Sequence, residues 1–339
     1  MSLRIGIVGA GANTKTRHIP GFQAIDGVEV VAVCNRSRES GQKAAEEFGI
    51  ATVYDHYKEL VNADDVDAVC VGTWPYMHCE ISIATLEAGK HILTEARMAM
   101  NLEEAREMQA AVRSDKVAMI VPAPFYLETE PRLLQMVKAG FFGDWLEVHV
   151  NALGGAYAPD ALLHWRQRRN FSGQNIMTMG ILNETVRRYA GHDRAVIASA
   201  TTFTKERVEE ESGSKRAVDV PESLGVVSEL EGGGTSVYHF SSVAEHGRGG
   251  VLEMHGTKAT FKLEDDSAFV AENGGNFQKL EVPKKEQWGW TVENDFVDAI
   301  RDGKPVTHTN FDDGVKYMEF TEAVQVSLAE GRKVELSSL

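Results

Sequence analysis

Residues 3–38 constrain the fold of this chain most, because they read as strand, glycine-rich turn, helix and strand. Residues 3–8 are apolar and β-branched, as a buried parallel strand requires. Gly9 and Gly11 follow at once, and residues 28–34 form a second apolar run. Gly9 permits a sharp turn, and Gly11 lets the backbone approach a pyrophosphate at the next helix N-terminus. The stretch therefore predicts a dinucleotide-binding βαβ unit.

The turn departs from the full G-x-G-x-x-G pattern, because Thr14 occupies the third glycine position. That glycine normally allows close packing of the helix on the strand. A plain βαβ turn of another α/β protein is therefore the competing interpretation. The strand, helix and second strand around the turn favour the dinucleotide, with Gly9, Gly11, Ala12, Asn13 and Thr14 as cofactor-binding residues.

The end of the second strand predicts which nicotinamide cofactor is bound. An acidic residue there would accept hydrogen bonds from the ribose of NAD and repel a 2′-phosphate. This chain has Asn35, Arg36 and Ser37, which can donate hydrogen bonds and pair with a phosphate. We therefore expect these three residues to bind NADP, with NAD as the alternative. A competing interpretation is that Arg36 only solvates the start of a helix.

Charge and cysteine content exclude several classes of function. The formal net charge of −15 argues against binding to nucleic acid or to an anionic membrane. Three cysteines lack the spacing of a metal site, so we predict no metal and reduced thiols in the cytoplasm. No apolar run reaches the roughly 18 residues of a membrane span.

The 339 residues predict two domains, with a boundary where prolines interrupt the pattern at 122–124. Strands alternate with helices through 1–122, which is typical of a Rossmann doubly wound parallel sheet in an α/β protein. Region 123–339 predicts an α+β domain with a large open mixed or antiparallel sheet, for substrate binding and oligomerisation. Its expected helices are 130–139, 173–190, 292–301 and 314–328, and its expected strands include 195–204, 224–230, 235–241, 250–256, 260–263 and 268–271.

Two further loops follow strands of the first domain, at the strand ends where open α/β sheets bind ligands. Thr73, Trp74, Pro75 and His78 follow the strand expected at 66–72, and Glu95 follows the strand expected at 90–94. We expect all five to line the cofactor site. Trp74 would pack on the nicotinamide or merely fill a core.

Several motifs along the chain resemble those of the glucose–fructose oxidoreductase / inositol dehydrogenase (GFO/IDH/MocA) family. They are the glycine turn, HIP at 18–20, LEAGKHILTE at 86–95, NLEEA at 101–105, MHGT at 254–257, FVDAIRDG at 296–303 and GRKV at 331–334. The resemblance covers nearly the whole chain. It implies a Rossmann domain and a mixed-sheet domain with the nicotinamide at their interface, and an enzyme that oxidises or reduces a sugar or polyol.

The family's reactive positions are atypical in this chain. The Glu-Lys-Pro of the family reads Glu95-Ala96-Arg97 here, so the lysine that touches nicotinamide and substrate is alanine. The family's Asp and His, four residues apart on a helix, correspond to Thr178 and Leu182. Glu184 projects about 120° away from that face, where an i,i+4 pair with Arg188 is the plain interpretation.

Candidate catalytic groups must therefore come from other positions. Arg97 is a poor base but would stabilise a substrate oxygen, unless it forms a structural salt bridge. His164 is a titratable candidate for proton transfer, although a lone histidine is more often structural. Arg166, with the arginines that follow it, would hold a substrate anion or simply face solvent. Tyr126 and Tyr157 are further candidate proton donors.

Three functions fit these features. The first is an NADP-linked oxidoreductase that transfers a hydride to or from a small sugar, polyol or related hydroxy or keto compound, with a non-standard acid–base set. The second keeps its dinucleotide and cleaves glycosides through transient oxidation. The third binds the dinucleotide as a sensor, without turnover.

The alternation of residues along one expected strand also predicts that copies of this chain associate. Tyr238 and Phe240 share one face of the strand expected at 235–241, and an exposed aromatic face usually marks an interface. We therefore predict a homodimer or homotetramer that packs through the second-domain sheet.

Overall fold

The computed structural model describes residues 2–123, 127–264, 267–306 and 308–339. Their contacts divide the chain into two compact units. Unit 1 comprises Met1–Pro122 with Thr291–Val315, and unit 2 comprises Ala123–Trp290 with Lys316–Leu339. The sequence-based boundary after residue 122 assigned all later residues to the second domain, whereas by their contacts Thr291–Val315 belong to unit 1.

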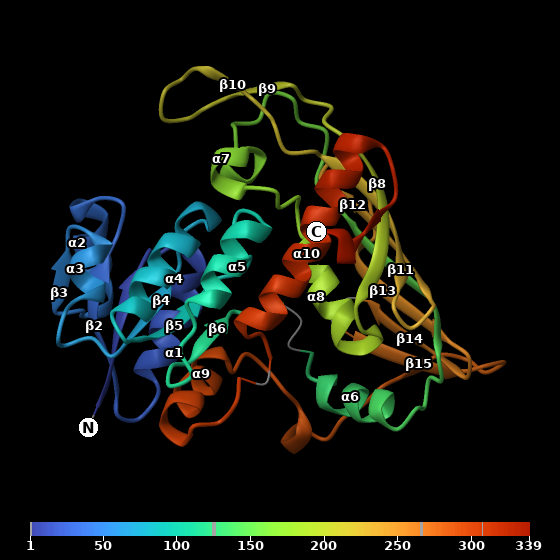
Figure 1. Ribbon diagram of the computed structural model, residues 1–339, viewed down its shortest axis with the longest axis horizontal. Coiled ribbons are helices and arrows are strands. Elements are labelled where there is room, and N and C mark those ends of the chain that lie inside the picture. Colours follow the sequence, from blue (N-terminus) through green and yellow to red (C-terminus); the bar gives the residue numbers. More distant parts are fainter. Residues whose placement is uncertain (1, 124–126, 265–266, 307) are drawn as a thin grey trace. The chain divides into compact units, whose positions relative to one another are not determined.

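Unit 1 contains a six-stranded parallel sheet in the order β3-β2-β1-β4-β5-β6 (Figure 1). The expected Rossmann fold is therefore confirmed. Its strands are β1 (Leu3–Val8), β2 (Val28–Cys34), β3 (Thr52–Tyr54), β4 (Ala68–Val71), β5 (His91–Thr94) and β6 (Ala118–Ile120). Its helices are α1 (Ile19–Gln23), α2 (Arg38–Phe48), α3 (Tyr57–Val61), α4 (His78–Glu87), α5 (Leu102–Ala110) and α9 (Val292–Asp302).

The strand order reverses between β1 and β4, which places the ends of these two strands at the topological switch point of the sheet. Right-handed crossovers put α1 and α2 on one face and α4 and α5 on the other. Helix α9 comes from far along the chain and packs against α1, where Phe22 and Phe296 meet edge to face. The late segment also covers the edge strand β6, because the backbone N–H of Ile120 donates to the carbonyl of Thr309.

Unit 2 contains a nine-stranded sheet in the order β16-β15-β14-β13-β7-β12-β11-β8-β17. Strands β7 and β12 run parallel, and the other neighbouring pairs are antiparallel, so the mixed sheet is confirmed. Its strands are β7 (Trp145–Leu153), β8 (Asp193–Thr201), β11 (Ser223–Leu230), β12 (Thr235–Ser241), β13 (Gly249–Gly256), β14 (Ala259–Glu264), β15 (Ser267–Glu272), β16 (Gln278–Lys279) and β17 (Val334–Glu335). The other elements are α6 (Glu130–Lys138), α7 (Arg169–Ser172), α8 (Met179–Ala190) and the hairpin of β9 (Glu206–Val208) and β10 (Lys215–Ala217). Helix α10 (Phe311–Glu330) starts in unit 1, which extends to Val315, and continues in unit 2 from Lys316.

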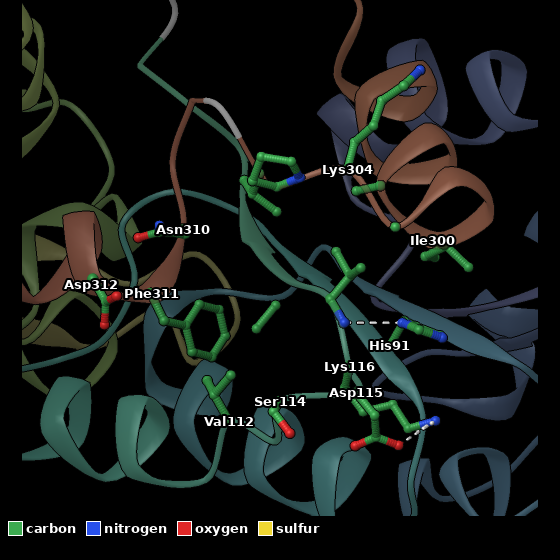
Figure 2. Close-up of a pocket in the computed structure, with 16 residues that line it drawn as sticks. His91, Val112, Ser114, Asp115, Lys116, Ile300, Lys304, Asn310, Phe311 and Asp312 are labelled. Carbon is green, nitrogen blue, oxygen red and sulfur yellow. Dashed lines mark hydrogen bonds and ion pairs between the residues drawn. The ribbon is translucent and has the colours of Figure 1, made fainter.

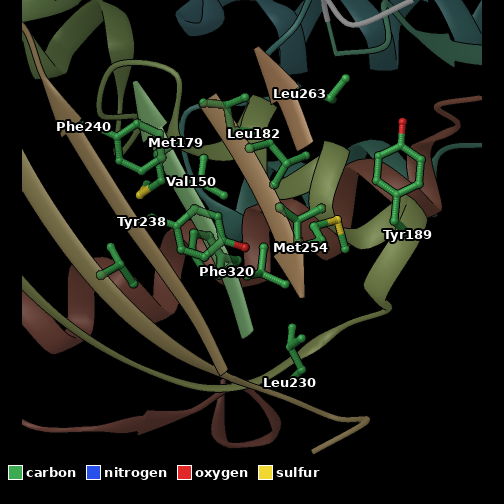
Figure 3. Close-up of a cluster of buried hydrophobic side chains, with 14 of the residues drawn as sticks. Val150, Met179, Leu182, Tyr189, Leu230, Tyr238, Phe240, Met254, Leu263 and Phe320 are labelled. Carbon is green, nitrogen blue, oxygen red and sulfur yellow. The ribbon is translucent and has the colours of Figure 1, made fainter. Parts of the chain in front are cut away.

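One face of the unit 2 sheet forms a core with α8 and the later turns of α10 (Figure 3). Tyr238 and Phe240 are fully buried in this core, and the Tyr238 ring centroid lies 5.2 Å from that of Phe320. The prediction that these two aromatics form an exposed face is therefore wrong. Alternation along β12 correctly puts them on one face, but the helices cover that face.

The helix expected at 173–190 begins later than its sequence pattern suggests. Gly173 and Met177 have φ angles of 62° and 46°, which lie outside the helical region. A short helix, α7, therefore ends before Gly173, and α8 starts at Met179 after Thr178.

Candidate functional site

The glycine-rich turn after β1 is closed by a second glycine-containing loop. Gly9 has a φ of +88°, a left-handed conformation that favours glycine. The Thr14 hydroxyl donates to the Gly9 carbonyl at 3.1 Å. A Cβ on Gly72, the residue after β4, would lie 1.9 Å from that hydroxyl oxygen. Gly72 therefore provides the space that the missing third glycine of the motif would otherwise supply.

This turn fits a dinucleotide. Gly11, Ala12 and Asn13 are exposed, and the nearest atom to a Cβ on Gly11 would be a carbonyl oxygen 3.3 Å away. The backbone after Asn13 continues as a π-helical turn, Thr14–His18, into α1. The buried hydroxyl of Thr73 has no hydrogen-bond partner in the described part of the chain. Accessible backbone N–H groups beside a helix start are the donors that a pyrophosphate needs.

At the end of β2, Asn35 and Ser37 make hydrogen bonds that shape the chain there. The Asn35 side-chain oxygen accepts from the backbone N–H of Ala10 at 2.7 Å, which ties β2 to the glycine turn. Ser37 is the N-cap of α2 and accepts from the backbone N–H of Ser40. Arg36 is exposed beside them.

The loop after β4 is braced by His78, which is fully buried. Its Nε2 lies 3.0 Å from the carbonyl oxygen of Thr73, and its Nδ1 lies 2.9 Å from that of Arg97. Burial lowers the pKa of His78, so the neutral ring donates to one of these carbonyls. Pro75 is also buried and Trp74 is half-buried. His78 thus links the loops that follow β4 and β5.

The loop after β5 carries a buried charged cluster, composed of Glu95, His18 and Glu293 with Asn13. The His18 Nε2 lies 3.0 Å from Glu95 Oε1, and its Nδ1 lies 2.5 Å from Glu293 Oε1. The Asn13 amide donates to the same Glu95 oxygen. Glu95 and Asn13 are residues predicted for the cofactor site, whereas no functional role was predicted for His18 or Glu293. No local signal connects those two, because they are 275 residues apart.

Both titratable groups in contact with His18 shift its protonation. Burial disfavours the charged ring, but the hydrogen bonds to Glu293 and Glu95 prevail and raise the pKa of His18 to about 9. Burial alone would raise the pKa of Glu95, yet the His18 hydrogen bond and charge lower it. His18 is therefore an imidazolium, and Glu95 a carboxylate, at neutral pH.

Arg97 and the segment around His164 occupy different units. Arg97 is only 3% exposed, in the loop after β5 of unit 1. His164 and Arg166 are exposed in unit 2, where His164 Nδ1 accepts from the backbone N–H of Arg166 at 3.2 Å. Partial desolvation of its ring and the Arg166 charge lower the pKa of His164, so the ring is neutral with the proton on Nε2. The Arg166 guanidinium stacks on Trp165, 4.3 Å from the ring centroid.

The two arginines that follow have structural partners. Arg168 pairs with Glu209 in the β9–β10 hairpin. Arg169 binds Asp219 through its backbone N–H and its guanidinium, and also contacts Gln325. Tyr157 is exposed, and Tyr126 lies outside the described residues.

Helix α8 presents no acid–base pair at the positions that the family uses. Thr178 is exposed at its N-cap, and Leu182 is buried in the unit 2 core. The expected pair of Glu184 with Arg188 is confirmed at 2.6 Å. Arg188 also reaches Glu130 at 3.1 Å, so one guanidinium joins two buried carboxylates.

A cavity of about 520 Å³ in unit 1 lies away from this site (Figure 2). It is lined by His91 at the start of β5 and by Lys116 and Ala118 beside the start of β6. The glycine turn and Glu95, in contrast, lie at the carboxyl ends of their strands. Lys116 pairs with Asp115 at 3.4 Å within the lining, so its charge is already compensated. This cavity is therefore not the expected dinucleotide site.

Two further features are absent from the described residues. Within residues 2–123, 127–264, 267–306 and 308–339, no group of three histidine, cysteine, aspartate or glutamate side chains is arranged to hold a metal ion. In the same ranges, no helix combines the length and apolar character needed to cross a membrane.

Comparisons with known proteins give two kinds of similarity. The chain is 33% identical over 175 residues to the 1,5-anhydro-D-fructose reductase of Ensifer adhaerens. The matched stretch covers 51% of this chain and 52% of that enzyme. It is 31% identical over 154 residues to the alpha-N-acetylgalactosaminidase of Shewanella oneidensis. That stretch covers 42% of this chain and 33% of that enzyme. The chain thus spans about half, or less, of each of these relatives.

Solved structures are similar over nearly the whole chain. Levoglucosan dehydrogenase in complex with NADH and L-sorbose superposes with a TM-score of 0.90, over 99% of both chains, at 22% identity. The superposition shows a shared fold. Residues 3–122 match the oxidoreductase family with an NAD-binding Rossmann fold, and residues 132–262 match the GFO/IDH/MocA C-terminal domain. With both domains matched in order and the predicted fold confirmed, the chain belongs to the GFO/IDH/MocA family of oxidoreductases.

Proposed function

We propose that this protein is an NAD(P)-dependent oxidoreductase that transfers a hydride between nicotinamide and a hydroxyl or keto carbon of a sugar, polyol or related compound. The observation that carries this proposal is the glycine turn, whose exposed backbone lies at the switch point of an NAD-binding Rossmann unit. The names of the reductase and the levoglucosan dehydrogenase support a sugar as substrate.

We further propose that NADPH binds more tightly than NADH. The residues that follow β2 are Asn35, Arg36 and Ser37. None of the three has a carboxylate that would repel a 2′-phosphate. Arg36→Ala should weaken NADPH binding by about 1.5–3 kcal/mol, because one charge-assisted hydrogen bond is lost. It should weaken NADH binding much less. Arg38→Ala is the matched control, because that guanidinium pairs with Asp55 at 2.8 Å. Equal or tighter binding of NADH in calorimetric titrations would refute the NADP preference.

The bound cofactor supplies or accepts the hydride, and the chain must supply the remaining groups. We propose that Arg97 stabilises the substrate oxygen, that His164 exchanges the proton, and that Arg166 holds the substrate. His164→Ala should then lower kcat by roughly 10²–10⁴-fold and leave NADPH affinity unchanged. Arg97→Ala should affect both kcat and cofactor binding. Restoring the family's lysine with Ala96→Lys should not raise activity. Full activity in His164→Ala would remove His164 from the mechanism.

We propose that the protein is a homodimer or homotetramer built through the unit 2 sheet. The face opposite the core carries Ile197, Val227 and Val237, which are 45%, 43% and 39% exposed. They are neighbours in one row across β8, β11 and β12. A row of exposed aliphatic side chains on a sheet favours association. Light scattering at micromolar concentration should give a multiple of the chain mass, and a monomer would refute the proposal.

A second candidate function, glycoside cleavage through transient oxidation, is favoured by the similarity to alpha-N-acetylgalactosaminidase. It predicts release of p-nitrophenol from a p-nitrophenyl glycoside with no net change in nicotinamide absorbance. Net reduction or oxidation of the cofactor with a free sugar would favour the dehydrogenase instead.

A further inference from the structure

The His18 ring is held between two carboxylates in the interior of unit 1. Its side chain has no exposed surface, and the Glu95 and Glu293 side chains are 16% and 3% exposed. Each ring nitrogen faces one carboxylate oxygen, at 3.0 Å and 2.5 Å. An imidazole nitrogen can bond a carboxylate oxygen only as a donor, so both nitrogens must carry protons. The geometry therefore favours the imidazolium form.

The ring connects three segments that meet at the cofactor side of the sheet. Glu95 directly follows β5, and its Oε1 accepts from both His18 and the Asn13 amide of the glycine turn. Glu293, in the first turn of α9, is supplied by the late segment that completes unit 1. A Cβ on Gly21 would lie 2.8 Å from the Glu293 carboxylate, so this glycine makes the space in which Glu293 lies.

We propose that His18, as an imidazolium shared by Glu95 and Glu293, is a positioning residue for the cofactor. It fixes Glu95 and Asn13 in one orientation, and through them the phosphate-binding turn and the loop after β5. His18 itself is fully buried, so in this proposal it acts through Glu95 and Asn13. The inference rests on the proposed binding of nicotinamide dinucleotides by unit 1.

This role makes cofactor affinity depend on pH. Glu95 and Glu293 face the ring, and buried Cys70 on β4 and His78 on α4 interact with these carboxylates. The charges of the two glutamates raise the pKa of His18 to about 9, while burial raises the pKa of Cys70 and lowers that of His78. Between neutral pH and pH 9, His18 is therefore the group of this set that changes charge. Loss of its proton would remove a donor that Glu95 needs.

The test is calorimetric titration with NADH, since that dinucleotide has no 2′-phosphate and isolates the loop geometry. Wild-type affinity should be constant from pH 7 to 8 and fall as the pH passes about 9. His18→Gln, whose side chain is uncharged and does not titrate, should weaken NADH binding by roughly 10- to 100-fold at pH 7 and abolish the pH dependence. Glu293→Gln should shift the fall in affinity to lower pH, because one of the two charges that stabilise the imidazolium is gone. His91→Gln, at the amino end of β5, is the matched control and should match wild type.

Two results would overturn the inference. One is unchanged NADH affinity and pH dependence in His18→Gln. The other is a neutral His18 ring at pH 7 in ¹⁵N NMR of the histidine-labelled wild-type protein, a measurement that does not depend on any variant folding. Failure of the wild type to bind NADH or NADPH at all would instead refute the proposed function, while an imidazolium signal in the same protein would still establish the charge state of His18.

Discussion

Replacing Arg188 by methionine should destabilise unit 2, because this guanidinium compensates two buried carboxylates. Its Nη2 donates to Glu184 at 2.6 Å and its Nη1 to Glu130 at 3.1 Å. The side chains of Glu130 and Glu184 are 0% and 4% exposed, and that of Arg188 is 15% exposed. Removing one partner of a buried pair costs about 3–5 kcal/mol, since the remaining charge is uncompensated. We expect Arg188→Met to lower the free energy of unfolding of unit 2 by an amount in this range at pH 7.

The cost should diminish as the pH is lowered. Burial raises the pKa of Glu130, and one of its oxygens, Oε2, is buried without a hydrogen-bond partner among the described residues. A carboxyl group with a raised pKa in the folded state contributes stability at low pH and loses it as the pH rises through the folded value. Without Arg188 that pKa rises further, so Glu130 takes up a proton at mildly acidic pH and the penalty shrinks.

Hydrogen exchange followed by mass spectrometry, on peptides that cover α8, measures the effect in unit 2 without assuming that the whole chain unfolds in one step. The matched variant Arg188→Met/Glu130→Gln/Glu184→Gln has no uncompensated charge and should recover most of the lost free energy. A loss below about 1 kcal/mol in Arg188→Met, or a triple variant no more stable than the single one, would refute the reasoning.

Three other predictions concern separate parts of the chain. Gly72→Ala should abolish NADPH binding in calorimetry, because its Cβ would lie 1.9 Å from the Thr14 hydroxyl, whereas Gly225→Ala, with nothing within 4 Å, should bind normally. Burial raises the pKa of Asp193, so the wild type should lose stability relative to Asp193→Asn as the pH rises above the ordinary aspartate pKa. Urea unfolding measures this difference in stability, and a difference that does not change with pH would contradict the prediction. Arg207→Met should increase proteolysis of the β9–β10 hairpin, because the Arg207 guanidinium holds the carbonyl of residue 158 at 2.6 Å; unchanged cleavage would contradict this.

The parts of the fold that were predictable depend on local patterns. Strand β1, its glycine turn and strand β2 follow from short apolar runs and from Gly9, which the structure places in the expected left-handed conformation. The pair of Glu184 with Arg188 follows from helical spacing alone. Strand β12 is found at the residues expected, because its alternation is regular.

The parts that were not predictable depend on long-range packing. Alternation places Tyr238 and Phe240 on one face, but only the packing of α8 and α10 decides that this face is buried. The pair of His18 and Glu293 forms because α9 packs beside α1, an arrangement that no spacing in the sequence encodes. The compensation of Thr14 by Gly72 likewise joins the ends of β1 and β4, which are neighbours only in the sheet.

The central claim, hydride transfer between nicotinamide and a sugar, is tested most directly by following the transferred atom. The protein would be incubated with NADPH deuterated at the nicotinamide C4 position and with a panel of keto sugars and anhydro sugars, and the products analysed by mass spectrometry. Our account predicts that at least one sugar product gains one deuterium on carbon, in proportion to the cofactor oxidised. Tight NADPH binding with no deuterium in any product would contradict hydride transfer to these sugars and favour a dinucleotide-binding sensor or a glycoside-cleaving enzyme.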